Sequence, residues 1–474
     1  MPFPRPLLPV LTFLWLSTGL LADGMLSHIR GNEDDTHLLN MVIIAEGYTQ
    51  SEEQLFADNV THIVSAVFDS VPYKHYSAFF NVWKIFVPSN ESGATHVLPD
   101  GTTEARDTYF GATYYSSSRV INIDKATVYD ILAEHIPDYD LICVLVNDKD
   151  YGGAAHGDIA VLSMNISNDP SMVYLHETGH AFAGLADEYE SAYSMSPREM
   201  YNVTAKTARN EISWRVWILD ETPVPTPEAT DYISVVGLFE GAMYQETGWY
   251  RPMLYCQMRS NYRRFCPVCI EAHIKQIYRH VSPVKRIQPD ITTLENPPDT
   301  TTLSVVTRAP EPNTLTITWY CDGREAGSGS KLQLSGLSPA TEEYVVKAVV
   351  RDTTAMVRNP AAREVLADSV SWRVKITTGT GAPVRRRIAE QELSATLHNG
   401  ALLIRGLQRD ADAVRIAVYN ARGTCVFRGT AVERLRQSAL TTIPGMNMSG
   451  GLYFVTVYGA APPVRSVVKM VVAE

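Results

Sequence analysis

The pattern of apolar residues changes near residue 286, and this change divides the 474-residue chain into two kinds of fold. Before it, apolar and β-branched runs at 38–49, 79–89 and 139–148 predict buried strands. Residues 51–73 have helical spacing, with Ser51 as the expected N-cap. The predicted apolar stripe of this helix is Leu55, Ile63, Val64, Val67 and Phe68. Strands and helices in this order predict an α/β (α+β) domain with a mixed sheet.

After residue 286 the chain consists of short alternating runs separated by Pro, Gly, Asn and Asp. This texture predicts two antiparallel β-sandwiches, the first of immunoglobulin-like character. Residues 377–387 are small residues, a proline and three arginines, which indicates a linker. We therefore expect an α/β domain at 24–285, an immunoglobulin-like sandwich at 286–379 and a second sandwich at 380–474.

The first 23 residues have the anatomy of a secretory signal peptide. They carry an early Arg5, an apolar run, and a small residue, Ala22, where a signal peptidase can cut. The apolar run is shorter than a membrane span and contains Pro9, which argues against an uncleaved anchor. We expect no transmembrane helix and a mature protein that is secreted or held at the outer cell surface. The formal net charge of −11, without a long basic run, argues against a nucleic-acid partner.

A histidine pair in the stretch VYLHETGHAFAGLADEYES, residues 173–191, has the spacing of metal ligands. His176 and His180 are four residues apart, so on a helix both imidazoles project from one face and can hold one zinc ion. Glu177 would then face the open coordination position and take a proton from the attacking water. The competing interpretation is a buried amphipathic helix with hydrogen-bonded histidines. The export signal and the carboxylates that follow favour zinc.

The residues after the pair offer a third ligand. Gly184 can end or bend the helix, and Asp187 and Glu188 follow directly. A carboxylate a few residues beyond such a turn can swing back to the metal. We select Asp187 for this role, with Glu188 as its supporting neighbour or a helix-end partner.

Further along the chain, three more residues are candidates for the same site. Met258 is expected either to form a methionine floor beneath the metal or to fill a gap in the core. Arg259 and Tyr262 follow closely and are candidates for contacting the substrate backbone or a tetrahedral oxyanion.

Seven stretches of the chain resemble the M64 metallopeptidases, a family named for an IgA-cleaving peptidase. In order, they are NMVIIAEGYTQSEEQLF, NVWKIFVPSNESG, DTYFGATY, VLVNDKDYGGAA, HETGHAFAGLADEY, YRPMLYCQMRS and FCPVCIEA, which cover most of residues 38–275. The resemblance implies a metzincin-like zinc endopeptidase with one Zn²⁺ per chain. It implies His176, His180 and Asp187 as metal ligands, Glu177 as the base and Met258 as the turn methionine.

The chain departs from the commonest metzincin pattern at two points. Gly184 stands one position later than the usual glycine, which would fall at Ala183. The third ligand is an acid rather than a histidine, so its identity stays open between Asp187 and Glu188. The middle β-domain resembles the sandwich that follows the catalytic domain in relatives. The tail is similar to the C-terminal sorting domains of type IX secretion, which implies the secretion machinery as a partner.

Two further segments have more than one interpretation. Cys256, Cys266 and Cys269 form a local cluster for which an exported protein favours a disulfide. With His273 they could instead make a closed structural zinc site, or the thiols could be free. Residues 151–158, YGGAAHGD, are either an edge strand that aligns a peptide substrate or a turn, and we favour the turn.

Taken together, these residues predict a secreted zinc metallopeptidase that hydrolyses extracellular proteins or glycoproteins, immunoglobulin A or mucin-like substrates among them. The alternative from another functional class is a non-catalytic surface binding protein or adhesin. Its β-sandwich domains would recognise a host glycoprotein or glycan, and any metal would be structural.

Overall fold

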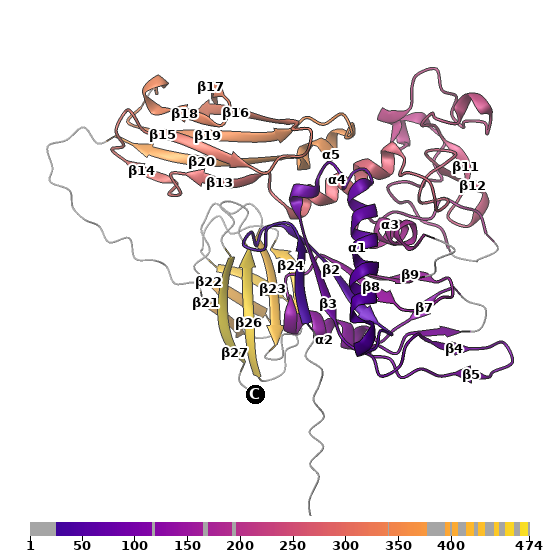
Figure 1. Cartoon of the computed structure of the whole chain (residues 1–474). Coiled ribbons are helices and arrows are strands. Elements are labelled where there is room, and N and C mark those ends of the chain that lie inside the picture. The colour runs from indigo at the N-terminus through magenta and orange to yellow at the C-terminus, as the bar shows by residue number, and fades with distance from the viewer. Residues whose placement is uncertain are drawn as a thin grey trace, which may run out of the picture.

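The computed structural model describes residues 25–115, 119–164, 169–191, 196–339 and 341–376, together with seven strands between residues 394 and 472 (Figure 1). The predicted signal peptide and the predicted linker lie outside the described residues. Within the described residues, no helix combines the length and the apolar composition needed to cross a bilayer.

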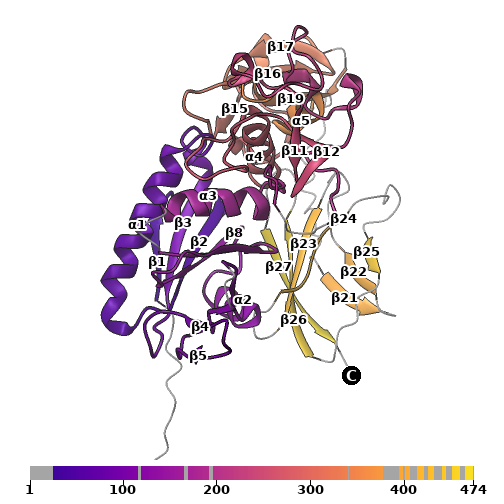
Figure 2. The same cartoon turned by 90° about the vertical axis from the view of Figure 1, so that its right-hand side faces the viewer.

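A six-stranded mixed sheet lies at the centre of the first part of the chain (Figure 2). Its strands are β1 (Met25–Arg30), β2 (Leu39–Glu46), β3 (Phe80–Phe86), β8 (Leu141–Val146), β9 (Gly153–His156) and β10 (Ile159–Ser163). The order is β1-β3-β2-β8-β10-β9, with β1 and β9 antiparallel to their neighbours and the other pairs parallel. All eight residues of β2 are buried, as expected for a strand covered on both faces. The predicted mixed sheet is confirmed.

Helices cover both faces of this sheet. They are α1 (Glu53–Asp69), α2 (Lys125–His135), α3 (Pro170–Ala181) and α4 (Pro267–His280). Met41 and Ile43 of β2 belong to one apolar core with α1, α3 and α4, whereas Val42 and Ile44 pack in a second core with α2. Because neighbouring residues of a strand point to opposite faces, α2 covers one face and the other three helices lie over the other.

Helix α1 differs from its prediction at its start. A 3₁₀ turn, η1 (Gln50–Glu52), precedes it, and Thr49 rather than Ser51 provides the cap: the Thr49 N–H donates to Glu52 at 2.8 Å. Leu55, expected on the apolar stripe, is 44% exposed, and the adjacent Phe56 is buried instead. The other four predicted stripe residues are buried.

Smaller elements surround the central sheet. A four-stranded sheet contains β4 (Thr95–Val97), β5 (Thr103–Glu104), β6 (Thr113–Tyr115) and β7 (Ile121–Asn122). A hairpin consists of β11 (Phe239–Ala242) and β12 (Gln245–Arg251). Short 3₁₀ helices are η2 (Ser77–Phe79), η3 (Arg209–Glu211), η4 (Arg215–Trp217) and η5 (Thr230–Tyr232).

Two sheets pack face to face in the middle part of the chain. One contains β13 (Val284–Gln288), β15 (Thr302–Thr307) and β18 (Lys331–Gln333). The other contains β14 (Thr293–Glu295), β16 (Leu315–Cys321), β17 (Arg324–Ser328), β19 (Glu343–Asp352) and β20 (Ala367–Lys375). The elements η6 (Leu334–Gly336) and α5 (Pro360–Val365) lie in connections between strands. Trp319 and Trp372 stack in the shared core with ring centroids 5.6 Å apart.

Buried carboxylates join this sandwich to the first part of the chain. Asp352, at the end of β19, accepts hydrogen bonds from the hydroxyls of Tyr76 (2.7 Å) and Tyr278 (2.8 Å). Glu271 of α4 accepts from the backbone N–H groups of Arg358 (2.5 Å) and Asn359 (2.9 Å) in the β19–β20 connection. Each carboxylate is at most 1% exposed, so both hydrogen-bond sets are shielded from water.

The described tail consists of strands in two sheets. One has the order β21-β22-β25 and the other β24-β23-β26-β27. The strands are β21 (Ser394–His398), β22 (Ala401–Arg405), β23 (Val414–Asn420), β24 (Cys425–Ala431), β25 (Leu440–Pro444), β26 (Gly451–Tyr458) and β27 (Arg465–Val472).

Candidate metal centre

Helix α3 carries the two histidines, and its start is set by local sequence. Asp169 is the N-cap, and its carboxylate accepts from the Ser171 N–H at 3.0 Å. Pro170 follows at the first helical position, where its missing N–H is not needed. His176 and His180, one turn apart, project from the same face with ring centroids 4.8 Å apart.

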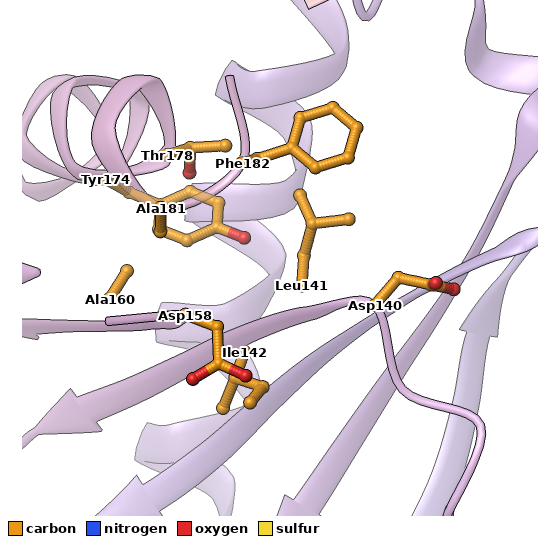
Figure 3. Close-up of a pocket in the computed structure, with 9 residues that line it drawn as sticks. All are labelled: Asp140, Leu141, Ile142, Asp158, Ala160, Tyr174, Thr178, Ala181 and Phe182. Atoms are coloured by element: carbon orange, nitrogen blue, oxygen red, sulfur yellow. The ribbon is translucent and has the colours of Figure 1, made fainter. Parts of the chain in front are cut away.

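The other side of α3 borders a small pocket. Tyr174, Thr178 and Ala181 line it from the helix, and Asp140 and Asp158 line it from the sheet side (Figure 3). At about 100° per residue, these helix positions lie roughly opposite the two histidines. The pocket therefore lies behind the helix and does not belong to the histidine face.

Three ligand atoms converge on that histidine face. The Nε2 atoms of His176 and His180 are 3.1 Å apart, and Asp187 Oδ1 lies 3.0 Å from the first and 3.3 Å from the second. In a tetrahedral site with bonds of about 2.0–2.1 Å, ligand atoms stand about 3.3–3.4 Å apart. The three atoms are therefore spaced as a single zinc-sized ion requires.

Backbone carbonyls fix the tautomer of both imidazoles. His176 Nδ1 lies 3.0 Å from the Gln257 carbonyl oxygen, and His180 Nδ1 lies 2.8 Å from the Leu185 carbonyl oxygen. A carbonyl can only accept, so each Nδ1 carries the proton and donates it. Each neutral ring then directs the Nε2 lone pair towards the shared centre, which is the arrangement that histidine metal ligands adopt.

A turn after α3 brings Asp187 back to the histidines. The Leu185 N–H donates to the Gly179 carbonyl at 2.9 Å, and the helix ends at Ala181. Gly184 adopts φ +64°, a left-handed conformation that favours glycine. The helix therefore ends three residues before Gly184, and the glycine belongs to the turn that follows. This turn brings the Asp187 carboxylate to the two histidines.

Met258 packs against α3 at Gly179, the residue before His180. It is fully buried, and its sulfur is 2.4 Å from the place where a Cβ on Gly179 would stand. The Met258 carbonyl also accepts from the Glu188 N–H at 2.8 Å. The methionine thus packs against α3 and is hydrogen-bonded to the segment that carries Asp187.

Tyr244 is a site residue that the sequence-based prediction missed. Its hydroxyl donates to Asp187 Oδ2, the carboxylate oxygen that does not face the histidines. The Met243 N–H donates to the Asp187 carbonyl at 3.0 Å, and the Tyr244 N–H donates to the Tyr189 carbonyl at 2.9 Å. These contacts come from the β11–β12 hairpin, 57 residues downstream, and no local sequence motif predicts them.

The charge of the site favours a cation. Burial lowers the pKa of His180, but the hydrogen bond and the charge of Asp187 outweigh burial and raise the pKa to about 9. Burial raises the pKa of Asp187, yet the two histidines hold it well below its usual range. A carboxylate that stays ionised beside two imidazoles attracts either a proton or a metal ion, and the two compete.

Glu177 lies beside this centre in a desolvated position. It is 8% exposed, and burial raises the pKa of its carboxyl, partly offset by the charges of His176 and His180. Its Oε1 lies 3.4 Å from where a Cβ on Gly153 would stand. A raised pKa brings a carboxyl closer to the pH at which a general base is most effective.

Gly153 belongs to β9, and this corrects the interpretation of residues 151–158 as a turn. The segment forms the last strand of the central sheet, antiparallel to β10. His156 of this strand is half-buried, and its Nε2 lies 2.6 Å from the Ile121 carbonyl oxygen. The two glycines allow close packing, since a Cβ on Gly153 would lie 2.6 Å from Val173 of α3.

A comparison with known protein families identifies the family of this chain. The family model for IgA peptidase M64 matches residues 28–234 and 228–277, which include every residue of the candidate metal centre. The chain belongs to this family. Membership makes it a peptidase, and M64 peptidases are metallopeptidases, so a metal ion is implied. No curated protein matches the sequence.

Solved structures give only weak likenesses to this M64 chain. SGBP-B of the Bacteroides ovatus mixed-linkage glucan utilization locus is 15% identical over 38% of this chain and 42% of that one, with a TM-score of 0.14. Fibronectin(III)-like modules of Clostridium thermocellum CbhA are 12% identical over 40% and 93%, with a TM-score of 0.14. Human protocadherin-24 EC1-2 is 13% identical over 40% and 97%, with a TM-score of 0.13. At these TM-scores none carries an argument.

The two residues predicted to contact substrate, Arg259 and Tyr262, each have partners within the protein. Arg259 donates to the Leu254 carbonyl at 2.8 Å and to the Glu190 carboxylate at 3.3 and 3.4 Å. Tyr262 is 58% exposed, and its hydroxyl accepts from the Asp169 N–H at 3.1 Å. Asp169 precedes the histidines by about two helical turns, or roughly 10 Å. The structure therefore gives Arg259 an ion pair and places Tyr262 at the start of α3.

The predicted cysteine cluster is present, with a different fourth member. Cys256, Cys266 and Cys269 are buried free thiols, so the structure has no disulfide between them. His273 points elsewhere, with its Nδ1 3.0 Å from the Tyr73 hydroxyl. Glu188 joins the cysteines instead, and the ligand atoms of all four lie within 4.8 Å of one another.

Proposed function

We propose that this chain is a secreted, zinc-dependent metalloendopeptidase with a metzincin-like catalytic domain. The observation that carries the proposal is the convergence of His176 Nε2, His180 Nε2 and Asp187 Oδ1, all within 3.3 Å of one another. Two imidazoles and one carboxylate are a ligand set that zinc accepts. Three protein ligands leave a fourth position for a reactant, which distinguishes a catalytic zinc site from a structural one.

The mechanism assigns each residue a separate task. A bound zinc ion supplies Lewis acidity, which polarises the scissile carbonyl and acidifies water. Glu177 takes the proton from the attacking water and later donates it to the leaving amine. Tyr244 holds Asp187 through the carboxylate oxygen that does not face the histidines. Met258 supports α3 from below, so that both imidazoles keep their orientation.

The direct test of the base is Glu177→Ala. We expect the variant to keep its zinc, because the three ligands are intact, and to hydrolyse a mixed peptide library about 100-fold more slowly or worse. Glu134→Ala, at an exposed position of α2, is the matched control and should behave like the parent. Full hydrolysis by a zinc-containing Glu177→Ala protein would remove Glu177 from the mechanism.

The proposed substrates are extracellular proteins or glycoproteins, with immunoglobulin A and mucin-like glycoproteins as the first to test. The family to which the chain belongs supports this choice, and so does the signal-like sequence at residues 1–23. We further propose that residues 380–474 are a sorting domain read by the secretion machinery. Deleting these residues should leave hydrolysis intact and keep the protein inside the producing cell.

A further inference from the structure

We propose that Glu188, Cys256, Cys266 and Cys269 form a second, closed metal site that binds zinc structurally, on the far side of the segment that carries Asp187. This site goes beyond the proposed peptidase function and does not depend on it. Each of its four residues offers one ligand atom, and all four residues are buried.

Two separations among the four ligand atoms are close to those of tetrahedral zinc. Cys256 Sγ and Cys269 Sγ are 3.6 Å apart, and Cys269 Sγ lies 3.3 Å from Glu188 Oε1. With Zn–S bonds of about 2.3 Å and Zn–O bonds of about 2.0–2.2 Å, a tetrahedral site needs separations of roughly 3.5–3.8 Å. Thiolate ligands select zinc over calcium or magnesium. Four protein ligands leave no open position, so the site would be structural.

Glu188 is the observation that separates a metal site from a simple thiol cluster. The residue is fully buried, and its Oε2 has no hydrogen-bond partner among the described residues. Its Oε1 accepts from Asn202 Nδ2 at 2.9 Å and faces Cys269 Sγ. A buried carboxylate with one unpartnered oxygen is costly, and a cation bound to its Oε1 would neutralise the charge of the group.

Backbone N–H groups at the start of α4 also point at the cluster. Cys266 is the N-cap of α4, and Cys269 lies in the first turn, where the positive end of the helix dipole stabilises negative charge. The Cys269 N–H points at Cys266 Sγ and the Cys266 N–H points at Cys256 Sγ, each at 3.4 Å. These N–H groups donate to sulfur and support negative charge on the cluster.

A disulfide explains fewer of these contacts than a metal ion does. One disulfide among three cysteines would leave the third thiol and the Glu188 carboxylate buried together. It would also give no reason for a carboxylate to point at three sulfurs. His273, the fourth ligand of the sequence-based alternative, is bound to Tyr73 and does not join the cluster.

The second site would position the first. Glu188 directly follows Asp187, and its N–H donates to the Met258 carbonyl at 2.8 Å. Cys256 lies two residues before Met258. A metal held by Glu188 and Cys256 would therefore clamp both the third catalytic ligand and the methionine floor from behind.

Metal analysis of the purified chain and its variants tests the proposal. We expect two zinc ions per chain in the parent, one in Cys266→Ser, and one in His180→Ala. Cys143→Ser is the matched control, because Cys143 is also a buried free thiol but lies in β8, and it should keep both ions. Two ions in Cys266→Ser would overturn the second site.

Two measurements on the unmutated chain cover the case in which Cys266→Ser does not fold. Cobalt substituted for zinc should give a thiolate-to-cobalt charge-transfer band, which the histidine and carboxylate ligands of the first site cannot produce. After denaturation with a chelator and without a reductant, all six cysteines should take up an alkylating reagent. Absence of the cobalt band, or a mass short of two alkyl groups because of a disulfide, would overturn the proposal.

The metal counts separate this inference from the proposed function. A parent with one ion that is lost in His180→Ala would refute the second site and leave the peptidase mechanism intact. A parent with one ion that is lost in Cys266→Ser would refute the catalytic site and keep the structural one.

Discussion

Gly179 is the residue of α3 that most closely limits what can lie beneath the histidines. The sulfur of Met258 is 2.4 Å from where its Cβ would stand, so any side chain there must displace the methionine. At Gly184 a Cβ would meet nothing within 4 Å, and only the backbone at φ +64° favours glycine. The two positions of the motif therefore favour glycine for different physical reasons.

We predict that Gly179→Ala weakens zinc binding and destabilises the protein by about 1–3 kcal/mol, as overpacking does. Gly184→Ala is the control: strain should cost about 1 kcal/mol while Met258 stays in place. Thermal unfolding with and without zinc measures both effects. Equal zinc affinity in Gly179→Ala and the parent would contradict the role given to Met258.

At the scale of residues, the sequence predicts those members of the site that lie close together along the chain. The four-residue spacing of His176 and His180, and a glycine followed by an acid, led to Asp187 because a helix and its turn are local geometry. Tyr244 and the position of Glu188 were missed, since both depend on contacts between segments far apart in the sequence. Arg259 and Tyr262 were chosen for their proximity to Met258 in sequence, and their contact with substrate stays a prediction.

At the scale of elements, the β11–β12 hairpin is what holds the third ligand. It brings Tyr244 to Asp187, and Arg251 of β12 is completely buried, where it pairs with Glu190 (3.2 Å) and Glu228. Arg251 also donates to the backbone carbonyl of Glu240 in β11. The hairpin is thus fastened to residues 187–190 both through its turn and through Arg251.

We predict that Tyr244→Phe lowers zinc affinity by roughly 10–100-fold, which is the usual effect of losing a group that orients a metal ligand. The fold should survive, because the Met243 and Tyr244 backbone hydrogen bonds remain. Tyr115→Phe, at a position of β6 that is 54% exposed, is the control. A competition titration with a chromogenic chelator gives the affinities. An unchanged value for Tyr244→Phe would show that the hairpin does not support the metal.

Periodicity predicted the elements better than their ends. Strand β2 and helix α1 were expected from buried runs and helical spacing, and both are present. The start of α1 was misplaced because a 3₁₀ turn capped by Thr49 precedes it, and Leu55 consequently lies outside the stripe. Strand β9 was interpreted as a turn because glycines usually mark turns, whereas here they allow the strand to pack against α3.

At the scale of the whole molecule, residue 286 marks a change of architecture but not a break in packing. The β19–β20 connection returns to the first part of the chain, where Val357 and Leu366 enter the same apolar core as α1 and α3. Asp352 lies between the hydroxyls of Tyr76 and Tyr278. The sequence pattern indicated the change of architecture, but it could not indicate that the sandwich completes the apolar core of the first part of the chain.

We therefore predict different outcomes for two truncations. A chain that ends after residue 376 should unfold at a temperature within a few degrees of the parent. A chain that ends after residue 285 loses the partners of Tyr76, Tyr278 and Glu271, and should be strongly destabilised or insoluble. Circular dichroism during heating checks both. Equal stability of the two truncations would show that the sandwich is an independent appendage.

The most direct test of the account measures peptide hydrolysis and zinc per chain on the same samples while zinc is returned to the chelated protein. We predict no hydrolysis in the metal-free chain, full hydrolysis once zinc refills the His176–His180–Asp187 site, and none in His180→Ala at any zinc concentration. Hydrolysis by the metal-free chain, or a fully zinc-loaded chain that cleaves no peptide, would contradict the assignment of this centre as a peptidase active site.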